Sequence, residues 1–139
     1  MLSLRVKPSL LHLLIGVAMD RRIQIVVNLM KEDLSRELIL DDVAKWLNIS
    51  PSRLRYLFKV ETGQSPTQYL KYLRMQKAKQ LVESTFLNVK QIMYELGIND
   101  ESHFVRDFKR TYGITITQYR LVCSNNFSNA DEVRAEQVN

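Results

Sequence analysis

The sequence predicts an all-α fold in which two helix-turn-helix subdomains are joined by a long central helix. Glycine and proline are scarce, with 4 and 3 copies among 139 residues, which disfavours the many turns of an all-β architecture. Apolar residues recur every three or four positions, the spacing that lines one face of a helix. A segment near residue 50 is also repeated near residue 100. These three observations carry the fold prediction.

Helices are expected at about 9–17, 20–34, 40–47, 51–62, 66–84, 89–96, 101–112 and 116–123. Four of them begin after a residue whose side chain can cap the first turn, namely Ser50, Ser65, Asn88 and Thr115. Pro51 and Pro66 occupy the first helical position after two of these caps, where proline is favoured. Gly63 and Gly113 stand where helices commonly end in the left-handed conformation.

The longest expected helix, 66–84, carries apolar residues on two edges, including Tyr69, Leu73 and Ala78. A helix with two apolar edges can pack against elements on both sides, so we expect it to bridge two subdomains. An ordinary amphipathic helix is the alternative. The expected organisation is an extension at 1–19, a subdomain at 20–64, a linker helix at 65–85, a subdomain at 86–123 and a disordered tail at 124–139.

The N-terminal extension contains the apolar run Leu10–Met19, preceded by Arg5 and Lys7. It lacks a clear small-x-small cleavage site, which argues against a signal peptide, and it is too short to span a bilayer. We expect a short helix or the remnant of a preceding domain.

The internal repeat is the most informative feature of the sequence. Shifted by fifty residues, seven pairs match, namely Ser52 and Ser102, Phe58 and Phe108, Lys59 and Lys109, Gly63 and Gly113, Thr67 and Thr117, Gln68 and Gln118, and Tyr69 and Tyr119. Upstream the shift is forty-nine, as for Leu47 and Leu96, so one extra residue lies in the connecting turn. Two copies are too few for a solenoid, and they predict two sister subdomains.

Each copy has the pattern of a helix-turn-helix unit. A short helix with an apolar face is followed by a tight turn at Asn48 or Gly97, both of which tolerate a positive φ. A second helix follows, with a core expected at Leu54, Leu57 and Phe58 in the first copy and at Phe104 and Phe108 in the second.

The opposite face of each second helix is exposed in this arrangement and fits a DNA major groove. The candidate DNA-binding residues of the first copy are Ser52, Arg53, Arg55, Tyr56 and Lys59. Those of the second copy are Ser102, His103, Val105, Arg106, Lys109 and Arg110. Arginine can bond two acceptors on guanine, and valine can touch a thymine methyl group. Lys59, Lys109 and Arg110 lie later on their helices, where phosphate contact is expected. An ordinary solvated charge is the alternative for each.

Charge and composition narrow the class of function. The net charge of +5 favours a polyanionic partner. The chain contains one cysteine, Cys123, which we expect to be a bystander thiol and which suits a reducing cytosol. The two histidines, His12 and His103, have no neighbouring cysteine cluster, so no metal and no cofactor are expected. No catalytic constellation is recognisable, and we predict that the protein is not an enzyme.

Several runs of residues match a known pattern, at 40–44, 50–54, 57–59, 63–66, 97–98 and 102–104. The most specific run extends from Arg106 to Arg110 and continues through Tyr112-Gly113-Ile114-Thr115 to Tyr119-Arg120. With these runs, residues 20–120 resemble the DNA-binding domain of the AraC/XylS family of bacterial transcription regulators.

The resemblance implies two helix-turn-helix units that read successive major-groove segments on one face of double-stranded DNA. By position, Ser52, Arg55 and Tyr56 match the first base-reading surface, and Ser102, His103 and Arg106 match the second. It also implies control of transcription initiation, most often activation through contact with RNA polymerase, in the bacterial cytoplasm on the nucleoid. We expect no membrane contact, and a monomer on DNA if the chain stands alone.

The sequence departs from the family pattern at two positions. Ile116 replaces a common proline, which should slightly loosen the start of the last helix, and Ile39 replaces a polar cap. Many members also carry a larger domain ahead of this one, whereas about nineteen residues precede it here, as in a stand-alone member or a fragment. A protein-interaction module that does not read DNA is the competing hypothesis. An RNA-binding helical protein has little support, because exposed aromatic residues that could stack on bases are few.

Overall fold

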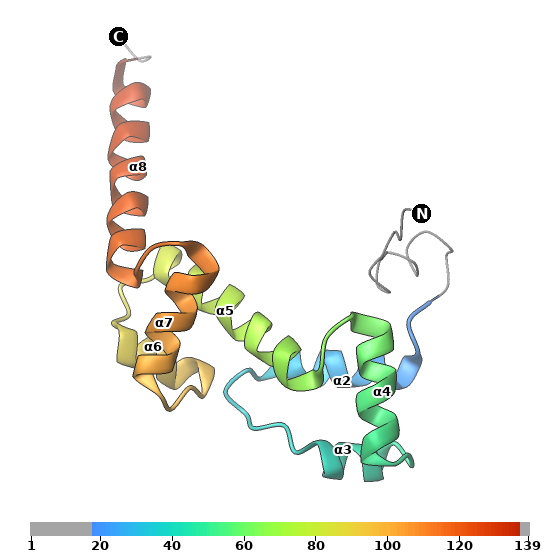
Figure 1. Cartoon of the computed structure of the whole chain (residues 1–139). Helices are drawn as coiled ribbons and strands as arrows, with labels where there is room; N and C mark the ends of the chain where they lie inside the picture. Colours follow the sequence, from blue (N-terminus) through green and yellow to red (C-terminus); the bar gives the residue numbers. More distant parts are fainter. Residues whose placement is uncertain (1–17, 137–139) are drawn as a thin grey trace, which may run out of the picture. The chain divides into compact units, whose positions relative to one another are not determined.

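The structure, a computed structural model, describes residues 18–136, with side chains as far as Asn126 (Figure 1). This part of the chain contains seven helices and no strand, which are α2 (Arg21–Glu32), α3 (Leu40–Trp46), α4 (Pro51–Thr62), α5 (Pro66–Ser84), α6 (Val89–Leu96), α7 (Glu101–Tyr112) and α8 (Ile116–Glu136). The all-α prediction is confirmed. Apart from the end of α8, the expected bounds agree to within about two residues, the usual uncertainty at helix ends. The helix expected at 9–17 lies outside the described residues.

The chain divides into two compact units, and the division falls inside α5, between Leu73 and Arg74. The first unit contains α2, α3, α4 and the first part of α5, and the second contains the rest of α5 with α6, α7 and α8. The long helix therefore belongs to both units and joins them. The finer boundaries expected from the sequence, at 20–64, 65–85 and 86–123, stay a prediction.

The core of the first unit forms where one face of α2 meets α3 and α4. Its buried residues are Ile23, Val26, Val27, Met30, Ala44, Leu54 and Phe58, and Tyr69, Leu70 and Leu73 of α5 pack against them. The Phe58 and Tyr69 rings meet edge to face, with centroids 5.5 Å apart and planes at 76°. Such edge-to-face pairs add about 0.5–1.5 kcal/mol beyond simple burial. Leu54 and Phe58, expected in the core, are fully buried, while Leu57 packs against the core from its edge.

The second unit repeats this arrangement with different residues. Its buried side chains are Met75, Ala78 and Val82 of α5, Ile92, Met93 and Leu96 of α6, Phe104 and Phe108 of α7, and Ile116 of α8. The Phe108 and Tyr119 rings meet edge to face, with centroids 5.8 Å apart and planes at 88°. Fifty residues separate this pair from Phe58 and Tyr69, so the sequence repeat is also a repeat of packing.

The turn inside each helix-turn-helix unit has the same backbone geometry in both copies. Asn48 and Gly97 have φ angles of 56° and 63°, in the left-handed region that the sequence predicted. The N–H of Ile49 donates to the carbonyl of Ala44, and the N–H of Ile98 donates to that of Met93, both across the turn. These hydrogen bonds satisfy carbonyls that the helix end leaves without a partner. They also set the direction in which the second helix of each pair leaves the turn.

Three further contacts tie α5 to α7 and α8 within the second unit. The Tyr112 hydroxyl donates to the carbonyl of Met75 at 2.9 Å, and the Lys79 ammonium lies 5.7 Å from the centre of the Tyr112 ring. The Tyr119 hydroxyl donates to the Glu83 carboxylate at 2.5 Å. The loop before α6 is also held, because the Arg120 guanidinium donates to the carbonyl of Leu87 at 2.6 Å. These contacts hold α7 and α8 against the second part of α5.

The end of α8 differs from the prediction. The sequence predicted a disordered tail at 124–139, whereas α8 continues to Glu136. The segment from residue 114 to 139 contains neither glycine nor proline, and Thr115 and Gln118 start the helix with the predicted capping hydrogen bonds. Once a helix is nucleated, each further residue adds one backbone hydrogen bond at little cost. Apolar periodicity, which the tail lacks, is therefore not required for this extension.

We predict that the substitution Ile39→Ser stabilises the first unit. Ile39 stands at the N-cap of α3 without a side-chain hydrogen bond to the first turn, and its side chain is 57% exposed. A serine hydroxyl there can accept from a free N–H of the first turn, which is typically worth about 0.5–2 kcal/mol. Urea unfolding measures the change. Ile39→Ala is the control, because it removes the same side chain without adding a cap. Equal stability of the serine and alanine variants would contradict the prediction.

A second prediction concerns stability at alkaline pH. The hydrogen bond to Glu83, followed by desolvation, raises the pKa of Tyr119 to about 12. Because the pKa is raised in the folded state, its contribution to stability is fully present below the ordinary tyrosine pKa of about 10 and is lost as pH rises toward the folded value. We expect the free energy of unfolding to fall more steeply between about pH 10 and pH 12 in the wild type than in Tyr119→Phe. Parallel curves for the two proteins would rule out this contribution.

Candidate nucleic-acid interface

Asp100 immediately precedes helix α7, and its carboxylate caps the first turn. Asp100 Oδ1 accepts the backbone N–H of His103 at 2.8 Å, and Glu101 adds a second negative charge to the first turn. Both charges are favourable at the positive end of a helix dipole. Phe104 and Phe108 turn one face of α7 into the core. On the opposite face, Arg106, Lys109 and Arg110 are exposed to solvent, while Val105 is partly exposed.

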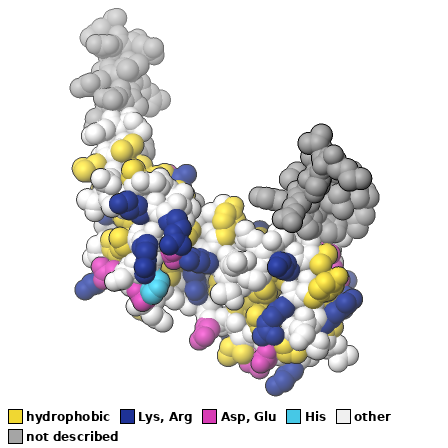
Figure 2. Space-filling view, viewed as in Figure 1, with side chains coloured by type: hydrophobic (Ala, Val, Ile, Leu, Met, Phe, Trp, Pro, Cys, Tyr) yellow, Lys and Arg dark blue, Asp and Glu magenta, His cyan; other side chains and the backbone are white. Residues whose placement is uncertain are grey.

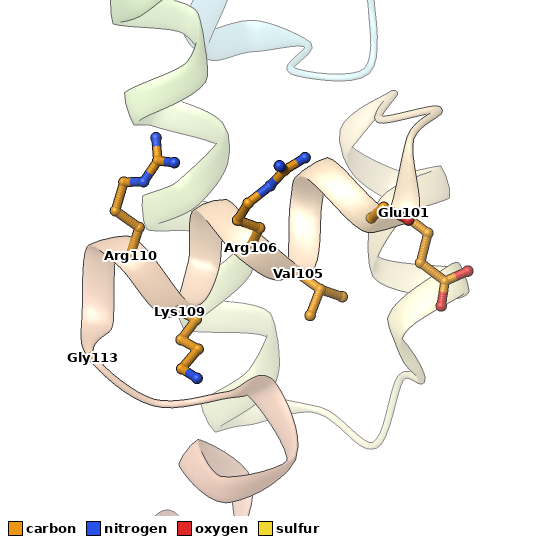
Figure 3. A pocket seen from close by; sticks show the side chains of 7 residues that line it. Glu101, Val105, Arg106, Lys109, Arg110 and Gly113 are labelled. Carbon is orange, nitrogen blue, oxygen red and sulfur yellow. The ribbon is translucent and has the colours of Figure 1, made fainter.

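A shallow hollow of about 750 Å³, here called the α7 hollow, lies along this outer face and is lined by Glu101, Ser102, Val105, Arg106, Lys109, Arg110 and Gly113. Figure 3 shows the side chains of Arg106 and Arg110 on one side of α7, with Val105 and Lys109 on the other. Each of these pairs is four residues apart, the spacing of neighbours on a helix face. Three cations and one carboxylate line the hollow, so it carries a net positive charge and suits an anionic partner.

One of the three cations of the α7 hollow, Arg110, has a side-chain partner within the described part of the chain. Arg110 lies 3.9 Å from the Asp107 carboxylate, while 73% of its side chain stays exposed. Within the described part of the chain, the Arg106 guanidinium makes no ion pair or hydrogen bond. Arg106 therefore keeps all of its donors available for a ligand, and breaks no internal contact when it binds one.

His103 stands apart from the hollow, although the sequence grouped it with the same surface. Its Nδ1 lies 2.6 Å from Asp100 Oδ2, and 68% of its side chain is exposed. Hydrogen bonds from the backbone and side chain of His103 lower the pKa of Asp100, which is therefore a carboxylate at neutral pH. Asp100 thus serves as both helix cap and side-chain partner of His103.

Helix α4 presents the corresponding surface of the first unit. The Ser50 hydroxyl accepts the backbone N–H of Arg53 at 3.1 Å and starts the helix before Pro51. The five residues predicted for this surface are all exposed, namely Ser52, Arg53, Arg55, Tyr56 and Lys59. On the face seen in Figure 2, Lys and Arg side chains gather on the surface of each unit.

Both arginines of α4 are engaged within the protein. The Arg53 guanidinium lies 5.6 Å from the centre of the Tyr56 ring, a cation-π contact. The Arg55 guanidinium lies 3.7 Å from the Asp41 carboxylate of α3, with more than half of each side chain exposed. An exposed pair of this kind contributes about 0–1 kcal/mol, so it orients Arg55 without locking it.

The structure brings most of the predicted α7 residues into one surface and adds others. Ser102, Val105, Arg106, Lys109 and Arg110 share the α7 hollow, whereas His103 does not line it. Sequence reasoning missed Glu101 and Gly113 as lining residues. Glu101 could have been found, since it precedes Val105 and Lys109 at four-residue spacing on the same helical face.

A second hollow, of about 290 Å³, lies in the first unit and has the opposite electrostatic character. Its lining residues are Leu29, Met30, Glu32, Asp33, Arg36, Glu37, Leu38, Ile39, Asp42, Val43 and Leu70. Four carboxylates against one guanidinium make it acidic, which repels a polyanion. The two hollows therefore distinguish the candidate interface, on α7, from a surface that nucleic acid would avoid.

Among the described residues, no group of three or more His, Cys, Asp or Glu side chains is placed to hold a metal ion. None of the described helices is both long and apolar enough to cross a membrane. Cys123 lies on α8, where it is partly buried and forms no disulfide.

A family model described as a helix-turn-helix domain matches residues 43–121, more than half of the chain. The lactose operon transcription activator of Staphylococcus xylosus is 35% identical over 98 residues, which cover 70% of this chain and 35% of that protein. The chain spans about a third or less of the length of the first curated relatives that it matches.

Solved structures share the fold. The C-terminal domain of AraT, a response regulator from Geobacillus stearothermophilus, superposes with a TM-score of 0.68 at 30% identity, over 75% of this chain and 87% of that domain. A transcriptional regulator from Chromobacterium violaceum, described among AraC-type DNA-binding domain-containing proteins, gives a TM-score of 0.66 at 28% identity, over 73% of this chain and 91% of that one. From the family match, the shared fold and these relatives together, we conclude that the chain belongs to the AraC/XylS family of helix-turn-helix transcription regulators.

Proposed function

We propose that this protein binds double-stranded DNA in a sequence-specific manner and regulates the initiation of bacterial transcription, with α4 and α7 as recognition helices in successive major grooves. The observation that carries the proposal is the outer face of α7, where Arg106, Lys109 and Arg110 line one exposed hollow. An α-helix fits the B-DNA major groove, and an arginine there can donate to both O6 and N7 of guanine.

Within the α7 surface, the expected contacts divide by position along the helix. Ser102, Val105 and Arg106 lie on the first part of α7, which enters the groove first in helix-turn-helix proteins. Lys109 and Arg110 lie on its last turn, where they are suited to phosphate oxygens. Glu101 repels phosphate, but its carboxylate can accept from the amino group of cytosine.

The proposed role of α4 follows from the same logic. Arg55 and Tyr56 are exposed on the face that leads away from Leu54 and Phe58. The Tyr56 ring, 61% exposed beneath Arg53, is available for apolar contact with bases or the sugar-phosphate backbone. Ser52 is placed for base edges and Lys59 for phosphate. The use of both helices on one DNA face rests on the family resemblance.

The remaining parts of the proposal concern the setting. A regulator of this kind acts in the cytoplasm on nucleoid DNA, as a non-catalytic protein without a cofactor. The relative in Staphylococcus xylosus is named a transcription activator, which supports a role in activation. Contact with RNA polymerase rests on the family resemblance alone. If the chain acts alone, two unlike recognition helices suit an asymmetric site, which one monomer occupies.

The competing function is a protein-interaction module that does not read DNA. A mobility-shift assay with genomic fragments separates the two, when unlabelled random DNA is added as competitor. Retention of particular fragments supports the proposal. Binding that random DNA abolishes to the same extent for every fragment would overturn sequence-specific recognition.

We predict that Arg106→Ala weakens binding to the selected site by about 1–3 kcal/mol and relaxes base preference at one position. Arg106 has no internal partner among the described residues, so its replacement should leave the fold intact. Titration of selected and random DNA measures the effect. Lys90→Ala is a control, because Lys90 is exposed on α6, away from the α7 hollow. An equal loss on both DNAs would assign Arg106 to phosphate instead of a base.

We predict a different signature for Lys109→Ala. If Lys109 neutralises a phosphate, its loss weakens binding to selected and random DNA alike, and the slope of log K against log salt falls by about one. Affinity measured over a series of salt concentrations gives the slope. A variant with an unchanged slope and altered base preference would place Lys109 against a base edge.

A further inference from the structure

The N-terminus of α7 contains a clamp in which one carboxylate holds two N–H groups of a single histidine. Asp100 Oδ1 accepts the backbone N–H of His103 at 2.8 Å, and Asp100 Oδ2 lies 2.6 Å from His103 Nδ1. The first contact caps the helix. The second fixes the orientation of the imidazole ring relative to the helix axis.

The clamp also determines where the imidazole carries its proton. The pKa of Asp100 is lowered by its hydrogen bonds to His103, so the group is ionised and can only accept hydrogen bonds. Nδ1 must therefore be the donor in this contact. In a neutral imidazole only one ring nitrogen carries hydrogen, and Nε2 is then left with a lone pair as an acceptor.

Nε2 is available to a ligand. The His103 side chain is 68% exposed, and within the described part of the chain its Nε2 forms no hydrogen bond or ion pair. His103 lies in the first turn of α7, next to Ser102 and one turn before Arg106. It is thus at the end of the helix that would enter a major groove first.

The corresponding position of the first unit lacks this clamp. Fifty residues earlier, Ser50 takes the place of Asp100 and Arg53 the place of His103. The Ser50 hydroxyl accepts the backbone N–H of Arg53, but the Arg53 side chain turns to the Tyr56 ring. Helix capping therefore does not require the second contact, and the Asp100–His103 pair is a separate feature of the second unit.

We propose that Asp100 sets the base preference of His103: by holding the proton on Nδ1, it leaves Nε2 to accept a hydrogen bond from the exocyclic amino group of adenine or cytosine in the major groove. These amino groups are the donors that bases present there, whereas guanine and thymine present acceptors at the same edge. Asp100 is a positioning residue in this scheme and touches no base. The inference rests on the proposed function, and it adds which class of base this helix reads.

The variant Asp100→Asn tests the inference, because it is nearly isosteric and asparagine caps helices as well as aspartate. Its amide oxygen can keep the bond to the His103 backbone, while its amide nitrogen faces Nδ1 as a donor. Nδ1 must then accept, and the proton moves to Nε2, which becomes a donor. At the base that His103 reads, preference is expected to shift from adenine or cytosine to guanine or thymine.

Selection of bound oligonucleotides from a random pool, at about pH 8 where histidine is ordinarily neutral, compares the wild type with Asp100→Asn, His103→Ala and Glu95→Gln. The last variant removes one negative charge from an exposed position of α6 that lies outside the α7 hollow, and should select the wild-type site. His103→Ala should lose preference at one position. The discrimination expected from one hydrogen bond is on the order of tenfold. Nitrogen NMR shifts of the His103 ring in the unbound proteins report the tautomer.

The outcomes separate the two proposals. A tautomer change in Asp100→Asn, together with a reversed base preference at the position that His103→Ala abolishes, supports the inference. If the wild type selects a defined site and Asp100→Asn selects the same one, or if Nε2 carries hydrogen in the wild type, the inference is overturned and the proposed function stands. If the wild type selects no site, both are overturned.

Discussion

Each unit depends on an edge-to-face contact between a buried phenylalanine and a tyrosine of the following helix, Phe58 with Tyr69 and Phe108 with Tyr119. The two phenylalanines are fully buried on α4 and α7. When one face of a helix is buried, the orientation of the helix about its own axis is fixed, and this determines which residues face solvent. The residues offered to a ligand are therefore decided by the aromatic pair on the opposite side of the helix.

The two units use this shared scaffold to present unlike surfaces. On α4, Arg53 contacts the Tyr56 ring and Arg55 pairs with Asp41. A ligand that binds these arginines must therefore either break these weak contacts or bind alongside them. On α7, the Arg106 guanidinium lies in a hollow without such a partner in the described residues. Duplication therefore preserved the packing while the surfaces diverged, as expected when the core constrains volume and the exposed face does not.

Capping residues link the stability of these helices to their chemistry. Asp100 satisfies a backbone donor of α7 and at the same time orients His103. Ser50 satisfies the equivalent donor of α4 and leaves Arg53 to find another partner. Ser50 and Asp100 each accept a backbone N–H of the first turn, so they differ only in their effect on the outward-facing side chains. The residue at the cap can therefore differ between the two units while both helices remain capped.

Local signals in the sequence were sufficient to predict most of the helix bounds of this protein. Caps at Ser50, Ser65, Asn88 and Thr115 and left-handed residues at Asn48, Gly97 and Gly113 act within one helical turn, so they predicted the helix bounds. The repeat and the 3.6-residue period predicted which side of α4 and α7 is exposed. The tail beyond Cys123 was misjudged, because helix propagation needs no apolar pattern.

The contacts between elements required the tertiary structure. The ion pair of Arg55 with Asp41, the bond of Tyr112 to Met75, and the grouping of Glu101 with the cations of α7 depend on distances in space and on rotamers. A linear pattern specifies which face a side chain occupies, but not which neighbour it meets there. The sequence by itself therefore determined the helices and their exposed faces, and the tertiary structure decided which charges on those faces are already engaged and which are open to a ligand.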